Sequence, residues 1–237
     1  MKQEQSRRIQ TSVLATAEKS ALVWLAQRQP QWITSDILTA IGVVGAIVVA
    51  AGYILSNSHI GWLWLSSLGF IINWYGDSLD GTLARVRNAQ RPIYGFYLDH
   101  NIDGVTIAIM CIGAGLSSLL NLYIAMSVLV IYLLLSISVY INAHLKGEFK
   151  LTYAGMGPTE FRLIMVVVNT LFALVASLRT WDFTIRLEHT TIHLGALDMV
   201  GVIILMVLSI IYVNNFVHDA EGYAKIDPVR KEWKVVK

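Results

Sequence analysis

Six long apolar runs divide this chain, and they restrict its possible folds more than any other feature. They cover residues 37–55, 60–83, 97–119, 122–143, 161–178 and 197–217. A helix needs about 20 mainly apolar residues to cross a hydrocarbon core of about 30 Å. The joints between the runs are short and polar. The sequence therefore predicts an all-α integral membrane protein with about six transmembrane helices.

Composition and charge exclude several other classes of protein. Of the 237 residues, 55% are hydrophobic and only 14% are charged, which is too apolar for a disordered chain or an ordinary soluble domain. The net charge of +2 is too small to indicate a nucleic-acid binder. Cys111 is the single cysteine, so the chain can form no intrachain disulfide and offers no thiolate metal cluster.

The distribution of basic residues predicts the orientation in the membrane. Lysine and arginine near span ends favour the cytoplasmic side. Most of the 18 basic residues lie before the first span, in the joints at residues 84–96 and 144–160, or after the last span. Arg179 and Arg186 lie on the opposite side, and Arg162 lies at a span entrance. We expect both termini on the cytoplasmic side of a bacterial-type inner or plasma membrane.

The chain divides into three predicted segments. Residues 1–36 form an N-terminal cytoplasmic or interfacial segment, residues 37–217 the six-helix membrane domain, and residues 218–237 a basic cytoplasmic tail. Within the first segment, apolar residues from Val13 to Leu25 alternate with Glu18, Lys19 and Arg28. This pattern favours an amphipathic helix along the membrane interface over the alternative, a mobile tail.

Four aspartates stand where a membrane helix should be apolar. Asp77 and Asp80 are three residues apart near the end of the second span, and Asp99 and Asp103 are four apart at the start of the third. Each spacing places its pair on one helix face, and a short loop can turn the two faces together. Converging carboxylates need a compensating charge. Because only hard oxygen ligands are available, the sequence predicts Mg²⁺ or Mn²⁺.

Small residues and an arginine accompany these aspartates. Gly76, Gly81 and Ala84 lie on or beside the face of Asp77 and Asp80, and Gly95 lies one turn before Asp99. Small residues let a ligand or another backbone approach closely. The Arg85 guanidinium can bind a phosphate through paired hydrogen bonds. Together with a metal, these features indicate a diphosphate ligand.

Residues 77–103 read DxxDGxxAR, nine residues, then GxxxDxxxD. This pattern resembles the signature of the CDP-alcohol phosphotransferases, also called CDP-alcohol phosphatidyltransferases, and all eight fixed positions are present. The resemblance implies a membrane transferase of phospholipid synthesis. Such an enzyme displaces CMP from a CDP-linked alcohol with the hydroxyl of a second alcohol and forms a phosphodiester. It also implies that the partners are these two substrates and membrane lipids, with a possible homodimer and no nucleic acid.

The resemblance also implies roles for individual residues. Asp77, Asp80 and Asp99 would bind the metal with the diphosphate, and Asp103 would complete the metal site and act as general base. Four residues would surround the cytidine and phosphate of the donor: Gly81, Ala84, Arg85 and Gly95. A family entrance motif before the first span is only partly present, because Thr39 matches it and Ser35-Asp36 does not.

Glu160 and Arg162 open the fifth span and allow two interpretations. They could contact the acceptor alcohol or its phosphate. Alternatively, Pro158 and Glu160 are ordinary signals for the start of a helix. The sequence favours neither interpretation over the other.

Two further alternatives stay open. The donor is expected to be CDP-diacylglycerol, whereas the Asp99-His100 pair is similar to that of enzymes that transfer choline or ethanolamine from a CDP-linked headgroup to a lipid alcohol. In a different class, intramembrane carboxylates can mark a cation or proton transporter. The four aspartates gather at one end of the spans rather than along a path, which favours the enzyme.

Overall fold

The computed structural model describes residues 7–9, 15–146, 148–150, 157–187 and 190–229. The fold is mostly helical, as the sequence predicts. Its six longest helices begin and end close to the six apolar runs: α2 (Ser35–Leu55), α3 (Leu63–Val86), α4 (Pro92–Gly115), α5 (Leu122–Lys146), α6 (Pro158–Leu174) and α8 (Ala196–Ile226). Two short helical segments, η1 (Ile60–Trp62) and α7 (Ala176–Thr180), precede α3 and follow α6.

By length and composition, α2, α5 and α8 are apolar enough to cross a membrane. The other long helices, α3, α4 and α6, are less apolar or shorter. Asp77 and Asp80 lie on α3, Asp99 and Asp103 lie on α4, and α6 has only 17 residues. Six membrane spans therefore stay a prediction, while three candidate spans are shown.

The N-terminal segment contains the expected helix, α1 (Ala15–Gln27). Its Leu22 and Ala26, one turn apart, are buried in an apolar cluster with Leu38 of α2 and Leu79 of α3. The apolar face of α1 thus packs against protein, and its position at a membrane interface stays a prediction. Val13 and Leu14 of the expected amphipathic pattern lie outside the described residues.

Two pairs of short strands depart from the all-α expectation. Strands β3 (Asp182–Leu187) and β4 (Thr190–Gly195) pair antiparallel, with Phe183 opposite Leu194. Strands β1 (Arg7–Ile9) and β2 (Glu148–Lys150) pair in parallel. The sequence interpretation treated residues 180–195 as a plain joint. It overlooked the alternation of apolar and polar residues from Phe183 to Leu187, which is typical of a strand.

The expected basic tail is partly helical. Helix α8 continues past Val217 to Ile226. Residues 230–237, which hold most of the basic residues assigned to the tail, lie outside the described residues.

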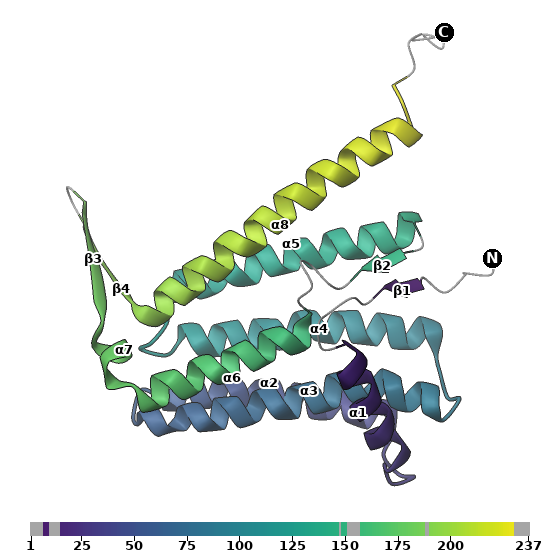
Figure 1. Ribbon diagram of the computed structural model, residues 1–237, viewed down its shortest axis with the longest axis horizontal. Helices are drawn as coiled ribbons and strands as arrows, with labels where there is room; N and C mark the ends of the chain where they lie inside the picture. Colours follow the sequence, from purple (N-terminus) through teal and green to yellow (C-terminus); the bar gives the residue numbers. More distant parts are fainter. Residues whose placement is uncertain (1–6, 10–14, 147, 151–156, 188–189, 230–237) are drawn as a thin grey trace.

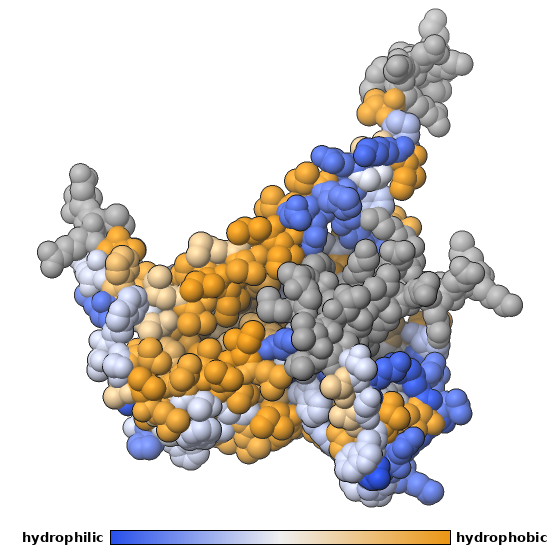
Figure 2. Space-filling model, viewed as in Figure 1, coloured by the Kyte–Doolittle hydropathy of each residue, from blue (hydrophilic) through white to orange (hydrophobic). Residues whose placement is uncertain are grey.

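Figure 1 shows how these elements are arranged. Helices α2 to α6 run along one direction, whereas α8 contacts α5 and slopes away from the others toward its C-terminal end. The β3–β4 hairpin lies at one end of the bundle, and the joint between α3 and α4 lies at the other. We name the latter the aspartate end; α1 lies there across α3. In Figure 2 apolar residues cover the middle of α6 and α8, whereas hydrophilic residues gather around α1. This distribution is typical of a protein embedded in lipid.

Helices α2 and α3 make the most extensive helix contact, and glycines allow it. A Cβ added at Gly69 of α3 would lie 2.5 Å from the Val49 nitrogen of α2, and one at Gly76 would lie 2.3 Å from the Gly42 nitrogen. Both distances are shorter than real Cβ contacts, so only glycine permits this backbone approach. The close contact holds the aspartate-bearing helix against α2.

This packing predicts that Gly69→Ala destabilises the protein. The added methyl group would force α2 and α3 apart, and overpacking of this kind costs about 1–3 kcal/mol. Gly222→Ala on α8 is the matched control, because a Cβ there meets no heavy atom within 4 Å. We expect the midpoint of thermal unfolding in detergent to fall for Gly69→Ala and not for Gly222→Ala. Equal midpoints would contradict the close α2–α3 packing.

Candidate functional site

Three of the four predicted aspartates meet near the aspartate end of the bundle. Asp77 comes from α3, and Asp99 and Asp103 come from successive turns of α4. Each offers one carboxylate oxygen, and these three oxygens lie within 4.8 Å of one another. The side chains are partly buried, and Thr39, Gly42 and Thr106 line the small pocket between them. The antiparallel arrangement of α3 and α4 thus brings together three of the four carboxylates that were expected to converge.

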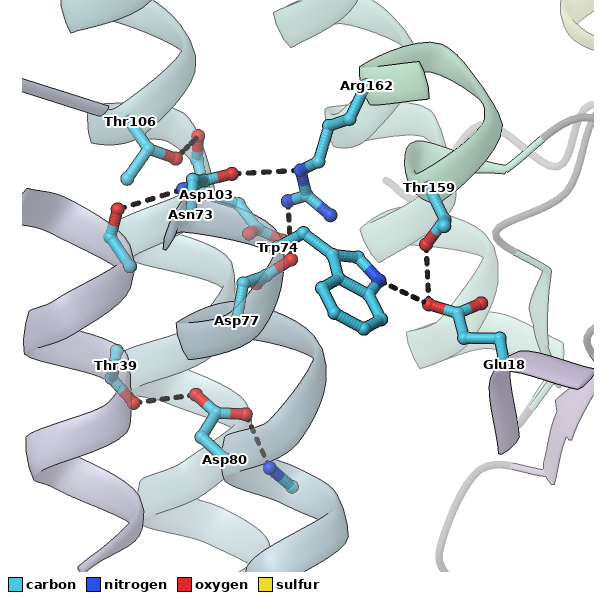
Figure 3. Close-up of polar contacts among 12 residues, drawn as sticks. Glu18, Thr39, Asn73, Trp74, Asp77, Asp80, Asp103, Thr106, Thr159 and Arg162 are labelled. Atoms are coloured by element: carbon cyan, nitrogen blue, oxygen red, sulfur yellow. Dashed lines mark hydrogen bonds and ion pairs between the residues drawn. The ribbon is translucent and has the colours of Figure 1, made fainter. Parts of the chain in front are cut away.

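Asp80 lies beside this trio and makes different contacts. Its residue is only 9% exposed, and its carboxylate accepts a hydrogen bond of 2.6 Å from the Thr39 hydroxyl of α2. It also accepts one from the backbone nitrogen of Gly81 (Figure 3). Thr39 was the one residue of the entrance motif that the sequence retained. Its contact explains how α2 supports the acidic face of α3.

Arg162 lies next to the trio and partly neutralises its charge. Its Nη2 is 2.5 Å from the Asp77 carboxylate, and its Nε donates a hydrogen bond of 2.8 Å to the side-chain oxygen of Asn73. Its Nη1 is buried and has no hydrogen-bond partner in the described part of the chain. Buried donors are almost always satisfied. This nitrogen can therefore donate to an anionic oxygen of a ligand.

Asn73 was not identified from the sequence. It is 2% exposed, and its amide nitrogen donates a hydrogen bond of 2.9 Å to the Gly42 carbonyl while its oxygen accepts from Arg162. One side chain thus connects α2, α3 and α6. The sequence did contain an indication of this role: Asn73 is a polar residue within an apolar run, and it lies one turn before Asp77 on the same helix face.

The donor set fits a hard divalent cation. Asp77, Asp99 and Asp103 provide carboxylate oxygens only, which suits Mg²⁺ or Mn²⁺ better than zinc. Three anionic groups at this separation repel one another in a medium of low polarity. Arg162 supplies one positive charge, and a bound cation would balance the remainder.

The residues expected around the donor lie at the more exposed part of the site. Arg85 is exposed, and its Nη2 donates a hydrogen bond of 2.9 Å to the Thr82 hydroxyl. A Cβ at Gly95 would meet no atom within 4 Å, and one at Gly81 would meet only the Arg85 guanidinium. Protein packing therefore does not require these two glycines. Gly81 leaves room for a ligand beside Arg85, Gly95 borders open space, and Ala84 is partly buried.

Glu160 and Arg162, which open the predicted fifth span, make different contacts in the structure. Glu160 accepts a hydrogen bond of 2.9 Å from the backbone nitrogen of Gly157, just before Pro158, the first residue of α6. This contact is the ordinary closure of a helix start. Arg162 instead points to the trio (Figure 3). Glu160 thus positions the first turn of the helix that carries Arg162.

Known proteins have sequences similar to this one. Residues 32–192 match the family model of the CDP-alcohol phosphatidyltransferases. The chain belongs to this family. It is also similar to cholinephosphotransferase 1 of Danio rerio, with 32% identity over 96 residues. That match covers 38% of this chain and 25% of the relative, so the chain spans about a quarter of the length of that relative.

The trio predicts measurable cation binding. We expect Asp99→Asn to weaken Mn²⁺ binding at least tenfold, because it removes one anionic ligand from the cluster. Asp182→Asn, at the opposite end in the exposed β3–β4 hairpin, is the control and should bind as the wild type does. Electron paramagnetic resonance of free Mn²⁺ measures both. Equal loss in the two variants would show that the trio does not hold the ion.

Proposed function

We propose that this protein is a divalent-metal-dependent transferase that displaces CMP from a CDP-linked alcohol with the hydroxyl of a second alcohol. One observation carries the proposal: the complete DxxDGxxAR(x)9GxxxDxxxD pattern lies on two helices that bring Asp77, Asp99 and Asp103 together. Membership of the CDP-alcohol phosphatidyltransferase family supports it. The aspartates form a cluster rather than a row across the bundle, so a transporter is the weaker hypothesis.

The proposed chemistry begins with the donor diphosphate. Asp77, Asp99 and Asp103 would hold the cation. Asp80, whose predicted role as a further metal ligand stays a prediction, lies beside them and accepts a hydrogen bond from Thr39. When bound, the cation would offset the negative charge of the diphosphate and stabilise CMP as leaving group. Arg85 would contact a phosphate oxygen, and Gly81, Ala84 and Gly95 would leave space for the cytidine end of the donor.

The acceptor hydroxyl would then attack the phosphorus next to the donor alcohol. A new phosphorus–oxygen bond forms, the bond to CMP breaks, and CMP leaves with the electron pair. Asp103 would take the hydroxyl proton as general base. Arg162, whose buried Nη1 has no protein partner in the described residues, would hold an oxygen of the acceptor or of the transferred phosphate.

Two donors are candidates. Similarity to a cholinephosphotransferase and the Asp99-His100 pair favour a CDP-linked headgroup with a lipid alcohol as acceptor. The description of the family as phosphatidyltransferases favours CDP-diacylglycerol with a polar acceptor. We place the headgroup donor first, because the similar relative is a cholinephosphotransferase and the Asp99-His100 pair is present. This reverses the preference that the sequence motif alone suggested.

The orientation is part of the proposal. Three basic residues lie in or next to the joint between α3 and α4: Arg85, Arg87 and Arg91. Helix α1 lies at the same end of the bundle. Basic residues favour the cytoplasmic side. The site would therefore open toward the cytoplasm, where CDP-linked substrates are soluble or accessible at the lipid surface. A homodimer stays a prediction.

Asp99→Ala should abolish CMP release. The assay uses purified protein in mixed micelles with Mg²⁺, and it offers CDP-choline or CDP-ethanolamine with diacylglycerol, and CDP-diacylglycerol with a panel of polar alcohols. Loss of one metal ligand removes the charge compensation of the diphosphate, and we expect at least a thousandfold loss. Asp182→Asn should retain full activity. Wild-type release by Asp99→Ala, or Mg²⁺ flux into liposomes without CMP release, would contradict the proposed function.

Arg162→Lys should show which of the two substrates Arg162 contacts. Lysine keeps the charge but cannot donate from Nε and both Nη atoms at once. We expect KM for one of the two substrates to rise about tenfold while KM for the other changes little. The substrate that is affected identifies the oxygen that Arg162 contacts. An unchanged KM for both substrates would remove Arg162 from the binding site.

A further inference from the structure

Glu18 of α1 connects the two helices that meet at the site, although no motif includes it. The Trp74 indole nitrogen of α3 donates a hydrogen bond of 2.9 Å to Glu18 Oε1, and the Thr159 hydroxyl of α6 donates one of 2.5 Å to the same oxygen. Figure 3 shows both side chains directed toward this carboxylate. Glu18 is partly buried, whereas its neighbour Lys19 is exposed.

The two partners of Glu18 lie close in sequence to the residues of the site. Trp74 lies three residues before Asp77 on α3, and Thr159 lies three residues before Arg162 on α6. Residues three apart lie on the same helix face, one turn from each other. The antiparallel helices α3 and α6 are thus bridged twice: through Glu18, which accepts hydrogen bonds from Trp74 and Thr159, and directly by the Arg162–Asp77 ion pair.

The rest of α1 is fixed in place, so Glu18 has a defined position. Leu22 and Ala26 are buried against α2 and α3. At the far end of α1, the Arg87 guanidinium donates hydrogen bonds to the backbone carbonyls of Gln29, Pro30 and Ile33 in the joint between α1 and α2. Helix α1 is therefore anchored by its buried face to α2 and α3, and through the joint that follows it to Arg87 at the end of α3.

We propose that Glu18 is a positioning residue that fixes α6 against α3 and thereby holds the Arg162 guanidinium over Asp77. This inference rests on the proposed function only for its kinetic readout. The carboxylate acts as a shared hydrogen-bond acceptor, not as a charge that contacts substrate. The N-terminal helix is thus a structural part of the active site.

The kinetic test compares Glu18→Ala with Glu18→Gln. The alanine removes the acceptor of both hydrogen bonds, so we expect about a five- to tenfold loss in kcat/KM, expressed as a raised KM for the same substrate that Arg162→Lys affects. The glutamine keeps an acceptor oxygen and should restore activity to within about twofold of wild type. Lys19→Ala is the matched control and should behave as wild type. Equal loss in Glu18→Gln and Glu18→Ala would overturn the proposal.

A double-mutant cycle with Thr159→Val adds an independent criterion. If both residues act through one contact, the loss in the double variant should be smaller than the product of the two single losses. A general folding defect would instead lower the fraction of active enzyme, and with it the apparent kcat, without changing either KM value. Independent, multiplicative losses would therefore overturn the proposal.

Hydrogen exchange provides a readout that does not depend on activity. We expect Glu18→Ala to speed amide exchange in the first turns of α6 several-fold, and Glu18→Gln and Lys19→Ala to leave it unchanged. If the wild type releases no CMP from any donor, the proposed function fails, and this exchange measurement still decides the role of Glu18. Unchanged exchange at α6 in Glu18→Ala would reject it.

Discussion

The repulsion among three carboxylates in an apolar helix bundle is the constraint on which the rest of this structure depends. Asp77, Asp99 and Asp103 place oxygens within 4.8 Å of one another. Such a cluster persists only when positive charge and hydrogen-bond donors surround it. Arg162 supplies part of this charge, and the donor set suits a divalent cation for the remainder. The surrounding helices hold these charged groups in a fixed frame.

That frame combines tight backbone packing with a few buried polar contacts. Gly69 and Gly76 let α3 approach α2 closely, and Asn73 and Thr39 then join the two helices beside the aspartates. The close approach brings α2 within reach of Asn73 and Asp80, and these two hydrogen bonds fix the depth of the aspartates. Helix α6 is connected differently: farther along it, Asn169 accepts a hydrogen bond from Tyr53 of α2 within an apolar cluster, whereas its first turns meet α3 through Arg162. In our proposal these first turns also depend on Glu18 of α1.

Much of this could be predicted from the sequence because the relevant signals are local. The apolar runs gave the long helices, and the spacing of Asp77, Asp80, Asp99 and Asp103 gave two acidic faces. The sequence did not separate the roles of Glu160 and Arg162, since both are polar residues at one helix start. It also missed the β3–β4 hairpin, whose alternation is short beside the stronger pattern of the flanking helices.

The sequence by itself determined the class of the protein, the helices that carry the aspartates and the residue types available to a metal and a diphosphate. Only the tertiary structure decided which of these groups meet. It turned Asp80 toward Thr39, directed Arg162 to Asp77, and brought Glu18 to Trp74 and Thr159. The physical reason is that periodicity fixes the face of a residue on its own helix, whereas the rotation and depth of neighbouring helices depend on packing between segments far apart in the chain.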